Sequence, residues 1–286
     1  MADITLKSNF PLENSQHEIP RLGFGVYLSP VTVCVKSCLE AFKSGYRHID
    51  TAQYYENEAS VGRAILESRL PRNQIFVTTK ILSPGKDVES TYRSVRDSVE
   101  KLVGKEDDGY VDLFLIHSPN GGAEARKLMW QALEKAKEEK IVRDIGVSNY
   151  GIAHIEEMRE YSKGNNWPPV VNQIELHPWC QQREIVEYCE KNKIVIEAYS
   201  PLVRNLKAED KTLEQLSKKH AAYANQILIR WSLQKGFVPL PKSDTPSRIH
   251  QNAQIFNFKL DEEDMKLLDG LDQGRDGAIV QAVTNS

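Results

Sequence analysis

Strand-like and helix-like segments alternate along almost the whole chain, and this alternation restricts the fold more than any other feature. Apolar runs rich in Val and Ile are typical of strands buried on both faces. After a short initial segment at 4–8, the sequence predicts strands near 22–26, 46–50, 75–80, 110–116, 143–147, 170–175, 194–199 and 237–241. Helices are predicted near 31–44, 57–68, 88–104, 123–140, 151–163, 181–192, 210–235 and 245–253.

Two architectures contain such an alternation, a (β/α)8 barrel and a doubly wound sheet. In a doubly wound dinucleotide-binding sheet, the first strand leads into a glycine-rich phosphate turn with three spaced glycines. The corresponding segment, Leu22-Gly-Phe-Gly-Val26, lacks the third glycine. No Pro/Gly/Ser-rich linker divides the 286 residues, and eight strand–helix units in a chain of this length are typical of a barrel. The sequence therefore predicts an α/β fold, with one (β/α)8 TIM barrel domain over residues 1–286.

Composition excludes several classes of function. The net charge of −3 gives no basic surface for nucleic acid or an anionic membrane. No apolar run approaches membrane-spanning length, and the N-terminus lacks the apolar core of a signal peptide. The four cysteines lack metal-ligand spacing and are too few for a disulfide scaffold in a chain of this length. We therefore expect a cytoplasmic protein with no metal site and with neither nucleic acid nor membrane as a partner.

Polar side chains stand where the predicted strands end. Asp50 and Lys80 end the second and third strands, His117 follows the fourth, and Tyr55 lies in the loop five residues after Asp50. In a TIM barrel the active site lies at the carboxyl ends of the strands. These four residues are therefore expected to meet at one mouth of the barrel.

The chemistry of these four side chains favours carbonyl reduction. A buried lysine needs a partner, and Asp50 is the obvious one for Lys80, although alone the two could form a merely structural ion pair. Tyr55 favours a catalytic role for the pair, because a nearby ammonium lowers the pKa of a phenol from about 10. We expect Tyr55 to donate a proton to a developing alkoxide and His117 to orient the carbonyl. Since no serine or cysteine is paired with a base, acyl transfer is less favoured.

The later strand ends offer a site for a hydride donor. Ser148, Asn149 and Gln173 could hydrogen-bond a carboxamide such as that of nicotinamide, and Tyr199 offers an aromatic face for stacking. The segment 241–252 follows the last strand and opens a helix, and helix N-termini attract phosphate. Three of its residues add charge and donors: Lys242, Ser243 and Arg248.

Taken together, these segments resemble the aldo-keto reductase family over about residues 22–271. The motifs that carry the resemblance are Gly45-Tyr-Arg-His-Ile-Asp50-Thr-Ala-Gln-Tyr-Tyr55-Glu-Asn-Glu58, Leu115-Ile-His117-Ser-Pro119, Gly146-Val-Ser-Asn149, Asn172-Gln173-Ile-Glu-Leu-His-Pro178, Ala198-Tyr-Ser-Pro-Leu202, and Pro241-Lys-Ser243 followed by Arg248 and Asn252.

The resemblance implies a barrel that transfers hydride from NADPH to aldehydes and ketones, reversibly and usually as a monomer. By this resemblance Tyr55 is the proton donor, Lys80 and Asp50 tune it, and His117 orients the carbonyl. The implied cofactor contacts are Ser148, Asn149, Gln173, Tyr199, Ser200, Leu202, Lys242, Ser243, Arg248, Gln251 and Asn252. The implied cofactor is NADPH or NADP+, and the implied partner is a small carbonyl compound.

Three features differ from the family pattern. Asp244 places a carboxylate beside the expected 2′-phosphate site, where it would weaken discrimination for NADP over NAD unless it points away. Ser118 replaces a residue that is often bulky, which suggests a roomier or more polar pocket wall. The tail after residue 271 is short and lacks aromatic residues. Aromatic pocket residues are expected at Tyr27, Tyr54 and Trp179, although each could equally serve ordinary packing.

Two other functions stay open at this point. A redox-sensing or accessory subunit could bind NADPH in the same barrel with slow turnover, because members of this kind keep the same four residues. A barrel hydrolase or isomerase would leave the lysine–tyrosine pairing without an evident role.

Overall fold

The computed structural model describes residues 4–13, 15–105 and 109–284. In this part of the chain, eight parallel strands form one sheet in the order β10-β9-β8-β7-β6-β5-β4-β3. They are β3 (Phe24–Gly25), β4 (His48–Asp50), β5 (Phe76–Ile81), β6 (Val111–Ile116), β7 (Val142–Ser148), β8 (Val171–Glu175), β9 (Val195–Tyr199) and β10 (Val238–Pro239). The backbone N–H groups of Gly23 and Gly25 donate to the carbonyl oxygens of Pro239 and Pro241, each at 3.1 Å. These bonds join the first and last strands, so the predicted (β/α)8 barrel is confirmed.

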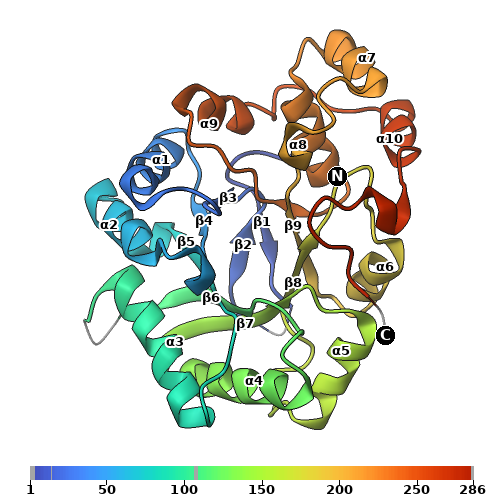
Figure 1. The fold of residues 1–286 in the computed structure, drawn as a ribbon. Coiled ribbons are helices and arrows are strands. Elements are labelled where there is room, and N and C mark those ends of the chain that lie inside the picture. The colour runs from blue at the N-terminus through green and yellow to red at the C-terminus, as the bar shows by residue number, and fades with distance from the viewer. Residues whose placement is uncertain (1–3, 14, 106–108, 285–286) are drawn as a thin grey trace.

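Helices surround the sheet (Figure 1). They are α1 (Val31–Lys43), α2 (Glu58–Ser68), α3 (Val88–Val103), α4 (Ala123–Glu138), α5 (Ile152–Glu157), α6 (Arg183–Lys191), α7 (Lys211–His220), α8 (Ala224–Gln234), α9 (Pro246–Ala253) and α10 (Glu262–Asp269). Short 3-10 helices span Gln53–Tyr55, Arg72–Gln74, Met158–Glu160, Val203–Asn205 and Gly274–Gly277. In α4, for example, Met129, Trp130 and Leu133 form a fully buried stripe. Burial of such stripes against the sheet stabilises the ring of helices.

Within the described residues, no helix combines the length and the apolar character needed to cross a bilayer.

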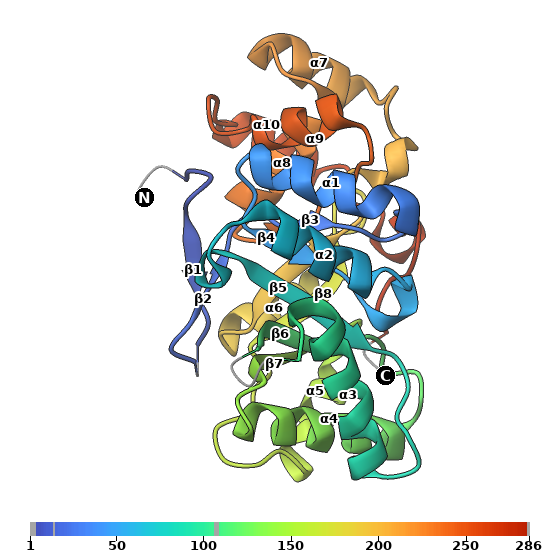
Figure 2. The same cartoon turned by 90° about the vertical axis from the view of Figure 1, so that its left-hand side faces the viewer.

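One end of the barrel is closed by a hairpin of β1 (Asn9–Pro11) and β2 (Glu18–Pro20). Leu12 and Ile19 of the hairpin segment belong to a buried cluster with Leu113, Val171 and Leu240 of the barrel. Figure 2 shows this hairpin on one side of the barrel and the C-terminal coil on the other. Because the hairpin covers the amino ends of the strands, the site is expected at the opposite end.

The observed elements differ from the predicted ones in several places, among them the hairpin β1–β2, which was not predicted, and α5, which ends at Glu157 and not near residue 163. The segment 210–235 was predicted as one helix, but α7 ends at His220 because Ala221 adopts a left-handed conformation (φ 49°). The last strand is shorter than 237–241, since Pro239 and Pro241 have no N–H to extend the ladder. Helix α10 was not predicted, although Asp261 caps it through a reciprocal bond with Asp264.

Candidate active site

A buried lysine lies at the centre of the carboxyl end of the barrel. Lys80 on β5 is fully buried, and its Nζ atom donates to Asp50 Oδ1 at 2.7 Å and to the carbonyl oxygen of Thr51 at 2.9 Å. The third hydrogen bond of Nζ goes to the Tyr55 hydroxyl at 3.1 Å. An ammonium group has three donors, so every donor of this lysine is used. One of them is aimed at the phenol.

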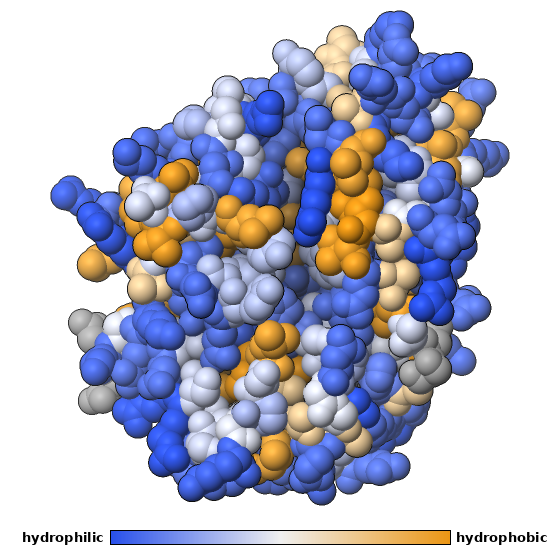
Figure 3. Space-filling model, in the orientation of Figure 1, coloured by the Kyte–Doolittle hydropathy of each residue, from blue (hydrophilic) through white to orange (hydrophobic). Residues whose placement is uncertain are grey.

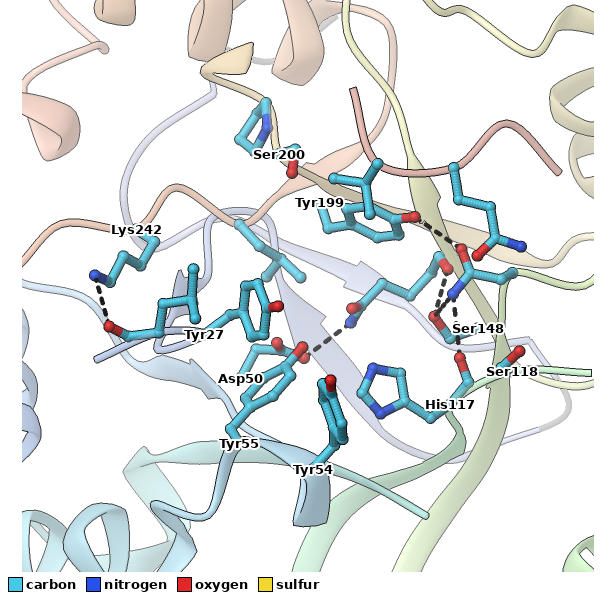
Figure 4. Close-up of a pocket in the computed structure, with 18 of the residues that line it drawn as sticks. Tyr27, Asp50, Tyr54, Tyr55, His117, Ser118, Ser148, Tyr199, Ser200 and Lys242 are labelled. Carbon is cyan, nitrogen blue, oxygen red and sulfur yellow. Dashed lines mark hydrogen bonds between the residues drawn. The ribbon is translucent and has the colours of Figure 1, made fainter. Parts of the chain in front are cut away.

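The strand register explains why these residues meet. Asp50 pairs with Thr78 of β5, and Lys80 lies two residues further along the same strand. Side chains two apart on a strand share a face, so Lys80 points to the barrel interior one step above that pair. The 3-10 helix Gln53–Tyr55 then turns the phenol back over the strand ends. Figure 4 shows Tyr55, Tyr54 and His117 facing the same space.

The Tyr55 hydroxyl keeps its proton at neutral pH. Burial raises the pKa of Tyr55, the Lys80 charge and hydrogen bond lower it, and Asp50 raises it again, with the balance at about 12. The lowered pKa expected from the sequence is therefore wrong. Burial outweighs the ammonium. The hydroxyl is nevertheless a proton donor next to a cation. It can therefore act as a general acid toward an alkoxide.

His117 is a neutral imidazole beside the phenol. Burial and the Lys80 charge lower the pKa of His117 to about 3. Its ring packs edge-on against Tyr55 and Tyr54, with ring centroids 5.6 and 6.1 Å away. Its Nδ1 atom has no hydrogen-bond partner within the described part of the chain. A neutral imidazole has one N–H donor, so the ring can donate to an oxygen next to Tyr55.

Gln173 is held beneath the site by two acidic side chains. Its Nε2 group donates to Asp50 Oδ2 and to Glu197 Oε2, both at 2.8 Å. Because the amide nitrogen faces these two acidic side chains, the amide oxygen is left on the opposite side as an acceptor. Burial, with the charge of Asp50, raises the pKa of Glu197 to about 8. Glu197 was missed in the sequence, where an acid within the apolar run 194–198 was the available signal.

Asn149 connects three parts of the site. Its Nδ2 donates to the carbonyl oxygen of His117 at 3.1 Å, and its Oδ1 accepts from the Tyr199 hydroxyl at 2.9 Å. Ser148 Oγ donates to the carbonyl oxygen of Gln173 at 2.8 Å. Asn149 has φ 61°, a left-handed conformation that asparagine tolerates. These bonds fix the orientation of the Tyr199 ring across the cavity from Tyr55.

A cavity of about 580 Å³ opens above these residues, within the size range of ligand pockets. Figure 3 shows a hollow near the middle of this face. Many predicted site residues line it: Tyr27, Asp50, Tyr54, Tyr55, His117, Ser118, Ser148, Asn149, Gln173, Tyr199, Ser200, Leu202 and Lys242. The sequence did not single out Gly25, Leu28, Leu82, Pro201, Arg204, Leu240, Val280 or Gln281, which also line it. Lys80 lies beneath the cavity.

Trp179 is not among the lining residues, in contrast to the prediction. Its side chain is only 1 % exposed. The returning C-terminal segment packs on its backbone, because Gln273 N–H donates to the Trp179 carbonyl oxygen at 2.9 Å. A Cβ atom on Gly277 would lie 1.8 Å from the same oxygen. Trp179 thus supports the tail rather than the cavity wall.

The segment before α9 carries the predicted phosphate contacts. Asp244 accepts from Ser29 Oγ at 2.6 Å and Ser37 Oγ at 2.8 Å, and Lys242 Nζ donates to it at 2.6 Å. Burial raises the pKa of Asp244, but Lys242 and the two serines lower it further, so the net shift is downward. The carboxylate therefore turns toward the serines but also engages Lys242. Arg248 is exposed in the first turns of α9.

The remaining predicted contacts lie near the end of α9 and beside Lys242. Asn252 is buried and accepts from Asn225 Nδ2 through its Oδ1. Gln251 is partly exposed one residue earlier. Ser243 Oγ accepts from the backbone N–H of Thr245 at 3.1 Å. Of this group only Lys242 is among the residues that line the cavity, and the structure places the others outside it, in or just before α9.

Known proteins resemble this chain over most of its length. The sequence model of the Aldo/keto reductase family matches residues 35–273. A glyoxal reductase of Bacillus subtilis is 38% identical over 94% of this chain and 94% of its own. A 9,11-endoperoxide prostaglandin H2 reductase of Trypanosoma cruzi is 41% identical over 90% of this chain and 89% of its own. The crystal structure of an aldo/keto reductase from Brucella melitensis superposes with a TM-score of 0.86 at 42% identity, covering 93% of this chain and 99% of that one.

Proposed function

The chain belongs to the aldo/keto reductase family, and from this premise we propose that it reduces the carbonyl group of small or medium aldehydes and ketones with NADPH, reversibly. The observation that carries the proposal is the Tyr55 hydroxyl, 3.1 Å from the buried Lys80 ammonium and beside the neutral His117 ring. A protonated phenol, a cation behind it and an imidazole donor are what an oxygen needs as it becomes an alkoxide.

In the proposed mechanism the protein supplies a proton and the orientation of the substrate. NADPH, when bound, supplies the hydride that adds to the carbonyl carbon. Tyr55 gives its proton to the carbonyl oxygen, and Lys80 stabilises the phenolate that remains. Asp50 holds Lys80 in the charged form and in position, through the 2.7 Å hydrogen bond. His117 donates to the same carbonyl oxygen and aligns it with Tyr55.

The chain offers contacts that fit a nicotinamide cofactor. Gln173 directs its amide oxygen away from the acidic side chains of Asp50 and Glu197, so this oxygen can accept from a carboxamide NH₂. The Tyr199 hydroxyl donates a hydrogen bond to Asn149, and this bond orients the Tyr199 ring toward the cavity. Lys242, Ser243 and Arg248 lie toward the start of α9, where the dipole of the helix favours phosphate. These contacts support a cofactor that runs from the cavity along α9.

The substrate side of the cavity is largely apolar. Tyr27, Leu28, Tyr54, Leu82 and Val280 line it, and each is exposed to solvent to a substantial degree. Ser118 adds a small polar group next to His117. This lining favours uncharged carbonyl compounds with an aliphatic or aromatic group.

The proposal is tested by the initial rate of NADPH oxidation with para-nitrobenzaldehyde, followed by absorbance. Steady turnover that depends on both NADPH and the aldehyde is the expected result. Tight NADPH binding without turnover on a panel of aldehydes and ketones would contradict it and favour a sensing or accessory role.

Arg248→Ala is expected to raise the KM for NADPH by about 10- to 100-fold, the effect of losing one hydrogen bond to a charged group. The KM for NADH should change little, because NADH lacks the 2′-phosphate. Steady-state kinetics with both cofactors measures this difference. An equal loss for the two cofactors would place Arg248 away from the 2′-phosphate.

Asp244→Asn is expected to lower the KM for NADPH by roughly twofold to fivefold, since a partly exposed ion pair contributes on the order of 1 kcal/mol. The change removes a negative charge near the phosphate site and frees Lys242, while Asn can still accept from Ser29. The KM values for NADPH and NADH are compared in the same buffer, because salt screens this effect. A weaker binding of NADPH in the variant would show that Asp244 instead positions Lys242 for the cofactor.

A further inference from the structure

One buried carboxylate holds the C-terminal segment against the barrel. The backbone N–H of Ile279 donates to Glu175 Oε1 at 2.6 Å. The N–H groups of Val280 and Gln281 donate to Glu175 Oε2 at 2.8 and 2.6 Å. Glu175 ends β8 and is fully buried. One side chain of the barrel therefore binds three successive backbone groups that lie more than one hundred residues away in the sequence.

Neighbouring residues complete this anchor. His177 Nε2 lies 2.8 Å from Glu175 Oε1. Gln182 Oε1 accepts from the backbone N–H of Val283 at 2.8 Å, and Gln182 Nε2 donates to the carbonyl oxygen of Glu175. Burial by itself raises the pKa of Glu175, but His177 and the three backbone donors lower it further, so the net shift is downward. Glu175 is therefore ionised at neutral pH, and the anchor weakens only as the pH falls through this lowered pKa.

The anchored segment forms part of the cavity wall. Val280 and Gln281 line the same cavity as Tyr55 and His117, and Val280 is 49% exposed. Figure 1 shows the C-terminal coil passing from α10 over the open end of the barrel, beside α6. The positions of Val280 and Gln281 at the cavity are therefore set by hydrogen bonds to a strand end.

We propose that Glu175 is a specificity-determining positioning residue, which holds residues 279–281 as a wall for carbonyl substrates with a large apolar group. The inference rests on the proposed function for its substrate class. Under this proposal, the reduction of a small carbonyl compound bound at Tyr55 and His117 is independent of the anchor. A large apolar carbonyl compound also contacts the wall formed by residues 279–281.

The carboxylate is needed for its two acceptor oxygens, not for its shape alone. Both Oε1 and Oε2 accept backbone N–H groups of the tail. In Glu175→Gln, either orientation of the amide therefore places an NH₂ group against at least one of these donors. The side chain keeps its size, but the anchor loses an acceptor and gains a repulsive contact.

The anchor is tested first without any use of catalysis, by amide hydrogen exchange of the full-length protein followed by mass spectrometry. Glu175→Gln is expected to speed exchange of residues 279–281 by about tenfold or more, since protection follows the free energy of local opening. Glu134→Gln is the matched control, because Glu134 is also fully buried and accepts a backbone N–H, from Lys163 at 2.6 Å. Unchanged exchange at 279–281 in Glu175→Gln would overturn the anchor.

The specificity role is tested by the kinetics of propanal and 2-naphthaldehyde reduction. Glu175→Gln is expected to raise the KM for 2-naphthaldehyde by about fivefold, the effect of losing a contact of one or two methyl-sized groups. The KM for propanal and both kcat values should stay within about twofold, a difference of less than 0.5 kcal/mol. An equal rise in KM for both aldehydes would show that Glu175 only stabilises the structure, and it would overturn the proposal.

A double-mutant cycle links the anchor to the wall. Val280→Ala is expected to raise the KM for 2-naphthaldehyde in the wild-type chain and to add little in the Glu175→Gln chain, because coupled residues are not additive. Additive effects would overturn the link. Absence of turnover by the wild type would overturn the proposed function and the specificity role with it, whereas the exchange experiment would still report on the anchor by itself.

Discussion

Tyr55→Phe is expected to lower kcat for carbonyl reduction by about 10²- to 10⁴-fold, the usual contribution of a general acid. The variant removes the hydroxyl that contacts Lys80 at 3.1 Å and leaves the ring that packs against His117. Cofactor binding should stay nearly intact, because no predicted cofactor contact uses this hydroxyl. The measurement is kcat for para-nitrobenzaldehyde at pH 7, where Tyr55 is protonated, with the Kd for NADPH determined by fluorescence.

Tyr54→Phe is the matched control for this experiment. Tyr54 lines the same cavity and contacts the same histidine, but it is 59% exposed and has no hydrogen bond to Lys80 among the described contacts. Loss of its hydroxyl should leave kcat within a few-fold of the wild type. If Tyr55→Phe reduced the aldehyde at the wild-type rate, or if Tyr54→Phe lost as much activity, Tyr55 would not be the proton donor.

The positions of the candidate site residues could be predicted because they depend on a repeated local pattern. Asp50 ends β4, Lys80 is the last residue but one of β5, and His117 follows β6. In a barrel all strand ends of one direction meet at one mouth. The alternation of apolar and helical segments was therefore enough to place these three together. Tyr55 followed from its short distance to Asp50 in the sequence.

What could not be predicted depends on contacts between distant segments and on burial. The pKa of Tyr55 reflects a balance in which burial outweighs the Lys80 charge, and no sequence pattern gives the extent of burial. The bonds of Glu175 to residues 279–281 join segments that no periodicity relates. The break between α7 and α8 rests on one left-handed alanine, Ala221, a residue that normally favours helix.

Lys80→Met is expected to lower kcat by about 10²- to 10³-fold, similar to the loss of one donor to an oxyanion. After proton transfer the Tyr55 oxygen is negative, and in the variant it would lie near the Asp50 carboxylate without a cation between them. The variant should also lose about 3–5 kcal/mol of unfolding free energy, because the buried Asp50 is left without its partner. Both quantities are measured, the first by steady-state kinetics and the second by urea unfolding.

The double variant Lys80→Met/Asp50→Asn separates the catalytic role of Lys80 from its structural one. With both charges removed, the buried site no longer holds an uncompensated carboxylate, so most of the lost stability should return. Catalysis should not return, because nothing stabilises the negative oxygen of Tyr55. If the double variant regained both stability and kcat, the ammonium would serve only to neutralise Asp50. If it regained stability alone, catalysis would require the Lys80 ammonium itself, through its 3.1 Å contact with Tyr55, and not only the neutralisation of Asp50.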